Sequence, residues 1–461
     1  MILLSTLLLA VLITIILIPM LNSLALRWQL VDIPNERKVH RQPIPRIGGV
    51  AMALGAAVPI VYWNFADRFV QAFMAGGCLL VLFGTIDDIR ELSPGIKFAG
   101  QTGAALIAVF LGGIRIESLG GLTPEGFILP GWIAVPLTVL AIVGVTNAIN
   151  LADGLDGLAG GICLLIFAGI GYLAYLDDNT LVGLLALALC GVIFGFLRFN
   201  THPASIFMGD AGSQFLGFSA ITLSLALTQG HATALSPVLP LILLGFPVLD
   251  TLTVMVTRIA RGRSPFAADK NHFHHNLMAF GFRHPESVII IYLFQTFLLL
   301  AAVIFRFYSD WLLLTGYLLF SILVLAGFSF AARTERKVKR FDFFDLRISG
   351  RLRLLKSEGT IIRPTFRIFE FGIPSLLFVT CLIASDPPVY VSLICALMAA
   401  FVMLIRYFRK VSLETSLRFV IYILVPFAVY LSDDRLPSIL GNSAAGFYNV
   451  SFGIFAVLII L

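Results

Sequence analysis

Residues 131–176 read GWIAVPLTVLAIVGVTNAINLADGLDGLAGGICLLIFAGIGYLAYL, two apolar runs joined by a short polar segment. Each run is close to the roughly 20 residues that a helix needs to cross a bilayer. Within Thr146–Gly161, Asn147, Asn150, Asp153 and Asp156 recur every third residue among glycines. Residues at this spacing lie near one another on a helix. Helix capping explains one such side chain, whereas four polar groups at membrane depth indicate a functional site.

The composition of the 461 residues is that of a membrane protein. Hydrophobic residues make up 59% of the chain and charged residues 13%, and the mean hydropathy is +0.96. Such a chain cannot cover a soluble domain with polar side chains. Its five cysteines lie in apolar runs without a CxxC pair, so neither a disulfide framework nor a thiolate metal site is indicated. We therefore expect an all-α, polytopic membrane protein.

Apolar windows of about 20 residues predict eleven membrane spans in a core of residues 1–331. The first apolar run, Ile2–Leu26, lacks a basic start, which favours a retained helix over a signal peptide. The predicted spans lie near 3–26, 47–65, 70–86, 96–116, 131–149, 159–176, 180–197, 211–229, 235–257, 287–305 and 310–331.

A C-terminal extension follows this core. Residues 332–370 are basic with interleaved Phe and Leu, which suits either a cytoplasmic linker or an amphipathic segment on anionic lipid. Residues 371–461 form a further membrane part of unknown role. Its four predicted spans lie near 370–385, 388–405, 417–432 and 445–461.

The basic residues are distributed unequally between alternate loops. Of the 32 lysines and arginines, 28 follow odd-numbered spans, so the positive-inside rule places these loops in the cytoplasm and the N-terminus outside. The five stretches with chemically interesting polar residues also follow odd-numbered spans, and loops on one face can converge on one cleft. These stretches are Asp32–Gly49, Asp87–Lys97, Asn147–Asp156, Phe199–Ser213 and Arg258–His284.

The first loop, DIPNERKVHRQPIPRIGG, contains three prolines that exclude a continuous helix. It therefore presents Arg37, Lys38, His40 and Arg46 on an extended segment that suits phosphate or nucleotide contact. A basic loop that only sets topology explains Arg37 and Lys38 equally well.

The second loop places Asp87 and Asp88 side by side at the end of a span, with Lys97 at the start of the next one. Adjacent carboxylates repel, so they indicate a divalent cation, a phosphate-bearing substrate or a proton transfer. Oxygen ligands favour Mg²⁺ or Mn²⁺ over zinc. Lys97 is either a phosphate ligand or a snorkelling anchor.

Two further stretches favour a bound diphosphate. Asp210 begins a span among small residues, where a helix N-terminus attracts anions or a metal–diphosphate pair; an N-cap is the alternative. The fifth loop carries His272, His274 and His275 near Arg263. These histidines lack the ligand that would complete a zinc site, so the cations indicate a diphosphate.

Taken together, NAINLADGLDGLAGG, FMGDAGS, the DDxxE pattern at Asp87–Glu91 and SPFAADKNHFHHNL resemble the motifs of the polyprenyl-phosphate N-acetylhexosamine-1-phosphate transferase superfamily. The HxHH form at His272–His275 is closer to the bacterial transferases that start O-antigen, enterobacterial common antigen or teichoic-acid chains. The phospho-MurNAc-pentapeptide transferases, which carry an unbroken histidine triplet, remain the alternative within the superfamily.

The resemblance implies a Mg²⁺-dependent enzyme, with Mn²⁺ as a substitute, on the cytoplasmic face of the bacterial inner membrane. It would transfer HexNAc-1-phosphate, most commonly GlcNAc-1-phosphate, from a UDP-sugar to polyprenyl (undecaprenyl) phosphate and release UMP. This is the first membrane step of cell-envelope polysaccharide synthesis, such as that of lipopolysaccharide. Asn150 and Asp210 would hold the metal. The sugar, the prenyl length and the pathway are not encoded in these motifs.

The remaining roles also follow from the resemblance. Asp87 or Asp88 would activate the lipid phosphate as a base or orient it, and Asp156 with Asp153 would contact the nucleoside. His274 would act at the phosphate oxygens as part of the catalytic set. The other expected substrate-binding residues are His40, Arg46, Lys97, Asn200, Arg263, His272 and His275.

A lipid-linked sugar flippase or carrier is the competing class of function. Carriers often contain paired repeats with polar groups near the bilayer midplane. This sequence shows no such duplication, and its carboxylates lie at span ends. Nucleic acid is not an expected partner, and a homodimer remains an open alternative.

Overall fold

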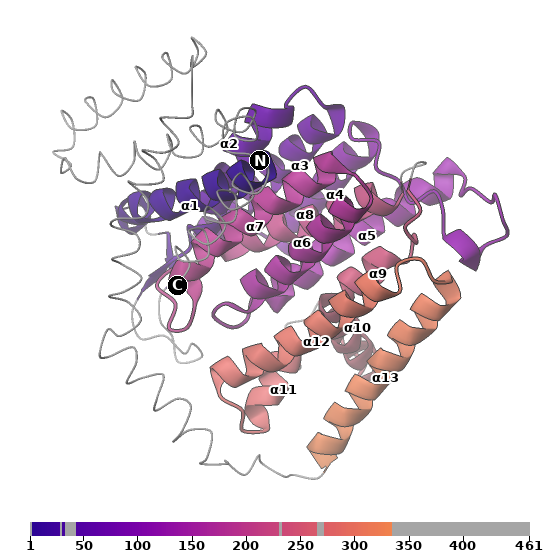
Figure 1. Ribbon diagram of the computed structural model, residues 1–461. Coiled ribbons are helices and arrows are strands. Elements are labelled where there is room, and N and C mark those ends of the chain that lie inside the picture. Colours follow the sequence, from indigo (N-terminus) through magenta and orange to yellow (C-terminus); the bar gives the residue numbers. More distant parts are fainter. Residues whose placement is uncertain (1, 28–29, 33–42, 230–232, 265–271, 334–461) are drawn as a thin grey trace, which may run out of the picture. The chain divides into compact units, whose positions relative to one another are not determined.

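Helices build almost all of the computed structural model, which describes residues 2–27, 30–32, 43–229, 233–264 and 272–333 (Figure 1). The spans predicted after residue 370 lie outside these residues. The elements are α1 (Ile2–Arg27), β1 (Val31–Asp32), β2 (Ile44–Pro45), α2 (Gly48–Asn64), α3 (Arg68–Arg90), α4 (Pro94–Phe110), the 3-10 turn η1 (Gly120–Leu122), α5 (Gly131–Ala152), α6 (Leu158–Leu176), α7 (Thr180–Asn200), α8 (Gly209–Thr228), α9 (Leu239–Leu243), α10 (Gly245–Ala260), α11 (Phe273–Ala279), α12 (His284–Ile304) and α13 (Asp310–Arg333).

The prediction of an all-α polytopic membrane protein is confirmed. Eight of the described helices are long and apolar enough to cross a membrane, and each of the eleven predicted core spans coincides with a helix or, at 235–257, with two helices. The chain divides into two units, Thr14–Val338 and a second one made of Met1–Ile13 with Lys339–Leu461. The first unit contains every predicted site residue.

The ninth predicted span is broken into α9 and α10 at Leu244. Pro247 lies four residues after Leu243 and has no N–H to donate to the Leu243 carbonyl. Gln295 of α12 replaces that donor, with its Nε2 2.8 Å from Leu243 O, and the Tyr317 hydroxyl of α13 donates to Gly245 O at 2.9 Å. Side chains of neighbouring helices therefore satisfy the carbonyl groups at the break, as a membrane interior requires.

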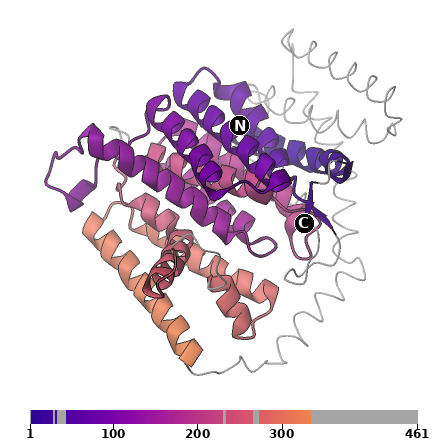
Figure 2. The same cartoon turned by 180° about the vertical axis from the view of Figure 1, so that it is seen from behind.

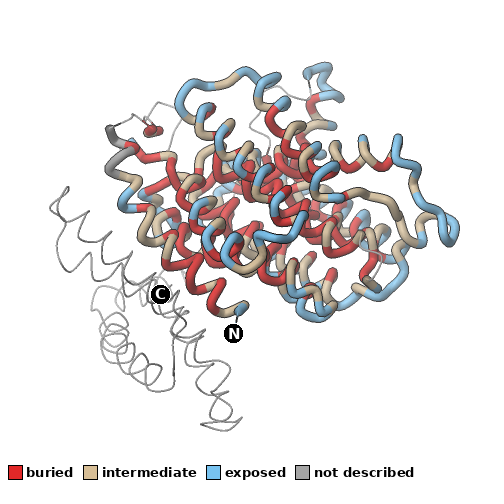
Figure 3. Tube along the Cα trace, turned by 90° about the horizontal axis from the view of Figure 1, so that it is seen from above, coloured by how far each residue is buried: buried red, intermediate tan, exposed pale blue. Residues whose placement is uncertain are grey.

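α8 is the most deeply buried of the long helices, and almost all of its residues are shielded by neighbours. Buried residues gather in the interior of the helix bundle (Figure 3). Small residues allow this packing. A Cβ at Gly49 of α2 would lie 2.1 Å from the Gly212 nitrogen, and one at Gly217 would lie 2.8 Å from the Thr146 Cα of α5. Larger side chains would push these helices apart, so glycine sets their close approach. The start of α8 is thereby fixed beside α2, α3 and α5.

The loops meet at two separate ends of the helix bundle. At one end, Gln229 Oε1 accepts the N–H groups of Glu117 and Ser118 at 3.1 and 3.2 Å, and Asp310 accepts the Gly121 N–H at 2.6 Å. These residues lie in the loops after even-numbered spans or at the edges of those loops. The loop that carries η1 and the β1–β2 pair lie far apart in both views (Figures 1 and 2). Loops after odd-numbered spans gather near the strands, and their contacts form the candidate site.

Candidate active site

Asp87, Lys97 and Asp210 come together from the end of α3, the start of α4 and the start of α8. Lys97 Nζ lies 3.0 Å from Asp210 Oδ2 and also pairs with Asp87. The Leu92 N–H donates to Asp87 Oδ1 at 2.6 Å. Asp87 is 4% exposed, whereas the Asp210 side chain is 27% exposed. One ammonium thus bridges two carboxylates and leaves net negative charge between them.

Asp88 has different partners from its neighbour. Its carboxylate accepts the backbone N–H groups of Asp210 at 3.1 Å and Ala211 at 3.4 Å. Gly209, at φ +67°, lets this approach occur, because a Cβ there would lie 2.3 Å from Asp88 Oδ2. Asp88 therefore caps the N-terminus of α8, whose first N–H groups have no partner within the helix.

Arg46 connects this cap to the strand pair. It forms an ion pair with buried Asp32 of β1, and its Nη1 lies 3.7 Å from Asp88 Oδ1. Antiparallel pairing of β1 with β2 brings Asp32 opposite Ile44, two residues before Arg46. The prolines that exclude a helix in the first loop are thus compatible with a short strand that positions the guanidinium.

Asn150 lies in the last turn of α5 and contacts the first turn of α8. Its Oδ1 accepts a hydrogen bond from the Ser213 hydroxyl at 2.6 Å. The same hydroxyl lies 3.1 Å from Gly209 O. Since Ser213 follows Asp210 by one helical turn, this bond holds the Asn150 amide beside the part of α8 that carries Asp210.

Asp153 is the C-cap of α5, and the pKa of its carboxyl reflects its burial among other acidic groups. Burial, followed by the charges of Asp210 and Asp156, raises the pKa of its carboxyl to about 7, against the opposing charge of Arg46. Among these acidic groups are the oxygen atoms that Mg²⁺ and Mn²⁺ prefer. The donor set and the uncompensated negative charge therefore fit a divalent cation held by Asn150 and Asp210.

His274 of α11 lies against the glycine that follows Asp153. A Cβ at Gly154 would be 2.4 Å from His274 Nε2, so only glycine leaves room for the ring. Burial, followed by the neighbouring His275, His272 and His284, lowers the pKa of His274 to about 3. Among the described residues, its buried Nε2 has no hydrogen-bond partner. A neutral imidazole beside Gly154 is therefore available to a substrate oxygen.

His272 is anchored by Asp250, a residue that the sequence analysis missed. His272 Nδ1 lies 3.0 Å from Asp250 Oδ2, and the Phe273 N–H donates to Asp250 Oδ1 at 3.0 Å. Asp250 is buried in α10. A lone carboxylate within the apolar span 235–257 was the available signal. The Asp250 carboxylate fixes the orientation of the His272 imidazole and the start of α11.

Asp156 lies beside two histidines that were also missed. Its Oδ2 is 2.7 Å from His202 Nδ1 and accepts the Ala204 N–H at 3.1 Å, while its own N–H donates to His284 Nε2 at 3.0 Å. The two imidazole rings stack with centroids 4.3 Å apart. These contacts join the turn after α5, the loop after α7 and the start of α12. No sequence spacing links residues so far apart.

The other predicted residues differ in their surroundings. Asn200 is buried, and its amide accepts from the Gly157 N–H at 2.9 Å and donates to Ile206 O at 2.8 Å, contacts that hold the loop around Asp156. Arg263 and His275 are exposed beyond α10 and on α11. His40 lies outside the described residues.

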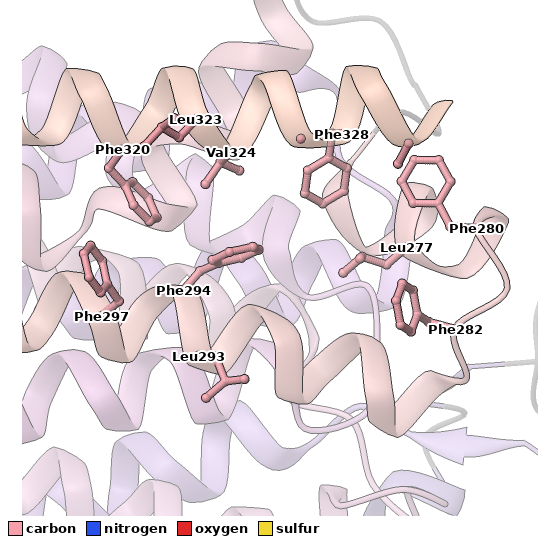
Figure 4. A pocket seen from close by; sticks show the side chains of 12 residues that line it. Leu277, Phe280, Phe282, Leu293, Phe294, Phe297, Phe320, Leu323, Val324 and Phe328 are labelled. Carbon is pink, nitrogen blue, oxygen red and sulfur yellow. The ribbon is translucent and has the colours of Figure 1, made fainter. Parts of the chain in front are cut away.

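An apolar groove begins next to the histidines, between α11, α12 and α13 (Figure 4). Leu277 of α11 and Phe280, the residue after α11, line it one and two turns after His274. Phe294 and Phe320 line it from the two long helices. Its volume is about 520 Å³. Polar groups able to hold a phosphate and a surface able to hold hydrocarbon thus lie along one short helix.

Comparison with known proteins finds one matching family and relatives whose names describe the same activity. Residues 70–228 match glycosyl transferase family 4. The chain is 40% identical over 300 residues to a probable undecaprenyl-phosphate N-acetylglucosaminyl 1-phosphate transferase of Bacillus subtilis (strain 168), covering 64% of this chain and 83% of the relative. Undecaprenyl-phosphate alpha-N-acetylglucosaminyl 1-phosphate transferases of Yersinia pestis and Escherichia coli (strain K12) are 31% and 30% identical over 327 residues, covering 69% of this chain and 90% and 88% of the relatives.

Proposed function

The chain belongs to glycosyl transferase family 4, and from this we propose that it transfers GlcNAc-1-phosphate from UDP-GlcNAc to undecaprenyl phosphate and releases UMP. The observation that carries the proposal is the meeting of Asp87, Lys97 and Asp210 from three helices. Asn150 and His274 reach the same end of the bundle. A flippase would not require this arrangement of oxygen ligands and cations.

We propose that Asn150 and Asp210 hold Mg²⁺, for which Mn²⁺ can substitute. When bound there, the ion would neutralise charge on the diphosphate of the donor. Lys97 lies between Asp87 and Asp210, so its ammonium is placed to contact phosphate oxygens of either substrate. Asp88 keeps α8, and with it Asp210, in position through its hydrogen bonds to the helix N-terminus.

In the proposed reaction, an oxygen of the lipid phosphate bonds to the β-phosphorus of UDP-GlcNAc. The bond from that phosphorus to the bridging oxygen breaks, and UMP leaves with the electron pair. A phosphate dianion is already nucleophilic, so positioning and charge neutralisation supply most of the catalysis. Asp87 orients Lys97, and neutral His274 offers its unpartnered Nε2 to a phosphate oxygen.

The nucleoside end of the donor is proposed to lie near Asp156, where the loops after α5 and α7 meet. The hydrocarbon of the lipid is proposed to lie along the apolar groove between α11, α12 and α13. This placement brings the lipid phosphate toward His272 and His274 without taking the prenyl chain out of the membrane.

We also place the reaction at the cytoplasmic face of a bacterial plasma membrane. Of the 32 lysines and arginines, 28 follow odd-numbered spans, and the candidate site is built from these loops. A cytoplasmic site has direct access to a water-soluble nucleotide sugar. The membrane supplies the second substrate.

The test is a panel of UDP-sugars given to purified protein with undecaprenyl phosphate and Mg²⁺, beside Asp210→Asn. We expect equal amounts of UMP and lipid-linked sugar phosphate from UDP-GlcNAc, and a loss of at least about 100-fold in the variant, because one metal ligand loses its charge. Movement of a lipid-linked sugar without UMP release would favour the flippase. Unchanged activity in Asp210→Asn would remove this residue from the metal site.

A further inference from the structure

Three amide side chains form a hydrogen-bonded cluster inside the helix bundle. Gln101 of α4 donates from Nε2 to Asn147 Oδ1 at 3.2 Å and to Gln214 Oε1 at 3.3 Å, while Asn147 Nδ2 donates to Gln101 Oε1 at 2.7 Å. Gln101 and Gln214 are 3% and 1% exposed. We call these three residues the amide layer, and Gln101 is its centre because it bonds both of the others.

Each member of the amide layer lies one helical turn from a residue of the candidate site. Gln101 follows Lys97 by four residues on α4, Asn147 precedes Asn150 by three on α5, and Gln214 follows Asp210 by four on α8. Side chains at these spacings lie above one another on a helix. The layer therefore joins the same three helices that present Lys97, Asn150 and Asp210.

The amide layer lies in the interior of the helix bundle, where its side chains have few other hydrogen-bond partners. An amide in an apolar interior is costly unless it is paired, and polar side chains between membrane helices act as specific contacts. Rotation or sliding of α4, α5 or α8 would break the bonds to Gln101. A displacement of about 1 Å at a reacting group can reduce a rate by about 100-fold.

We propose that the amide layer fixes the rotation and register of α4, α5 and α8, so that Lys97, Asn150 and Asp210 meet around one divalent cation. This inference rests on the proposed function for its kinetic consequences. Gln101, Asn147 and Gln214 are positioning residues that act through the site residues one turn away.

The design of the test separates positioning from stability. Gln101→Met leaves the buried Gln214 amide without its partner and leaves the half-buried Asn147 with only its 3.0 Å bond to Val143 O. This change lowers stability and disturbs the geometry of the site. The triple variant Gln101→Met/Asn147→Leu/Gln214→Met removes all three amides together, and replacing every partner with an apolar side chain is often nearly neutral for stability. Thr222→Val is the matched control, because Thr222 is buried on α8 but bonds only its own helix, at Phe218 O.

Three quantities are measured on full-length purified protein: the melting temperature, the Mn²⁺ dissociation constant from the paramagnetic resonance signal of free Mn²⁺, and kcat with the KM for UDP-GlcNAc. We expect Gln101→Met to lower the melting temperature, weaken Mn²⁺ binding at least about fivefold and lower kcat at least about tenfold. The triple variant should regain most of the melting temperature while Mn²⁺ binding and kcat stay low. Thr222→Val should match the wild type.

A triple variant with wild-type melting temperature, Mn²⁺ affinity and kcat would overturn the proposal and leave the layer a purely structural role. Gln101→Asn provides a second test, since it stays polar but is one methylene too short to reach both partners. Unchanged Mn²⁺ binding in Gln101→Asn would also contradict the proposal. Wild-type protein that binds Mn²⁺ but makes no UMP would refute the transferase, while the Mn²⁺ titrations would still decide the role of the layer.

Discussion

Replacing Asp88 with asparagine tests whether this carboxylate positions a helix or takes part in chemistry. The wild-type side chain accepts two N–H groups at the start of α8, from Asp210 and Ala211. An asparagine has one acceptor oxygen, so one N–H loses its partner. A lost cap hydrogen bond costs about 1 kcal/mol.

We therefore expect Asp88→Asn to lower the free energy of unfolding by about 1 kcal/mol. Asp210 is part of the turn that Asp88 holds, so turnover should fall about tenfold through misplacement of that residue. Thermal unfolding and turnover, measured on the same preparation, test both expectations.

Asp67→Asn is the control for the loss of a carboxylate on the same helix. Asp67 caps the opposite end of α3, where its Oδ1 alone accepts the N–H groups of Phe69 at 2.8 Å and Val70 at 3.1 Å. An asparagine keeps this oxygen, so Asp67→Asn should keep near wild-type stability and full turnover. The reasoning would be refuted if Asp88→Asn kept wild-type stability but lost turnover about 1,000-fold.

Three further results are expected. The pKa of His274 is about 3 in the folded protein and 6.5 ordinarily, so only the unfolded chain gains a proton there as pH falls from 6.5 to 3. The stability of the protein should therefore fall over this range. His274→Asn should flatten a plot of melting temperature against pH. The pKa of Asp153 is about 7, so Mn²⁺ should bind more tightly as pH rises through 7 and the Asp153 carboxylate ionises. In titrations of Asp153→Asn, Mn²⁺ affinity should depend less on pH. Gly154→Ala places a Cβ 2.4 Å from His274 Nε2, which should cost about 1–3 kcal/mol in unfolding experiments and lower turnover; wild-type values for both would mean that the ring is not held there.

The membrane spans could be predicted from the sequence because hydrophobic length alone determines them. The break at Leu244 was missed, since its stability depends on Gln295 and Tyr317 from helices far along the chain. Pro247 was a local signal of the interruption, but a proline in a membrane helix does not reveal whether other side chains will satisfy the freed carbonyl.

The candidate site was predictable only in part for a similar reason. Asp87, Asn150 and Asp210 could be predicted as site residues because they are polar residues at the ends of apolar spans. The different roles of Asp87 and Asp88 could not be read from two adjacent letters, since their partners lie on α4 and α8. The contact between Asp156 and His202 likewise depends on tertiary packing.

In the proposed reaction, the converging loops hold a diphosphate while a lipid phosphate attacks its β-phosphorus. UDP-GlcNAc carrying radioactive phosphorus at the β-position tests this directly when it is incubated with the purified protein, Mg²⁺ and undecaprenyl phosphate. We expect the label to pass to the lipid and the released UMP to be unlabelled. Label recovered in UDP would show that the sugar moves without its phosphate and would contradict the proposed reaction.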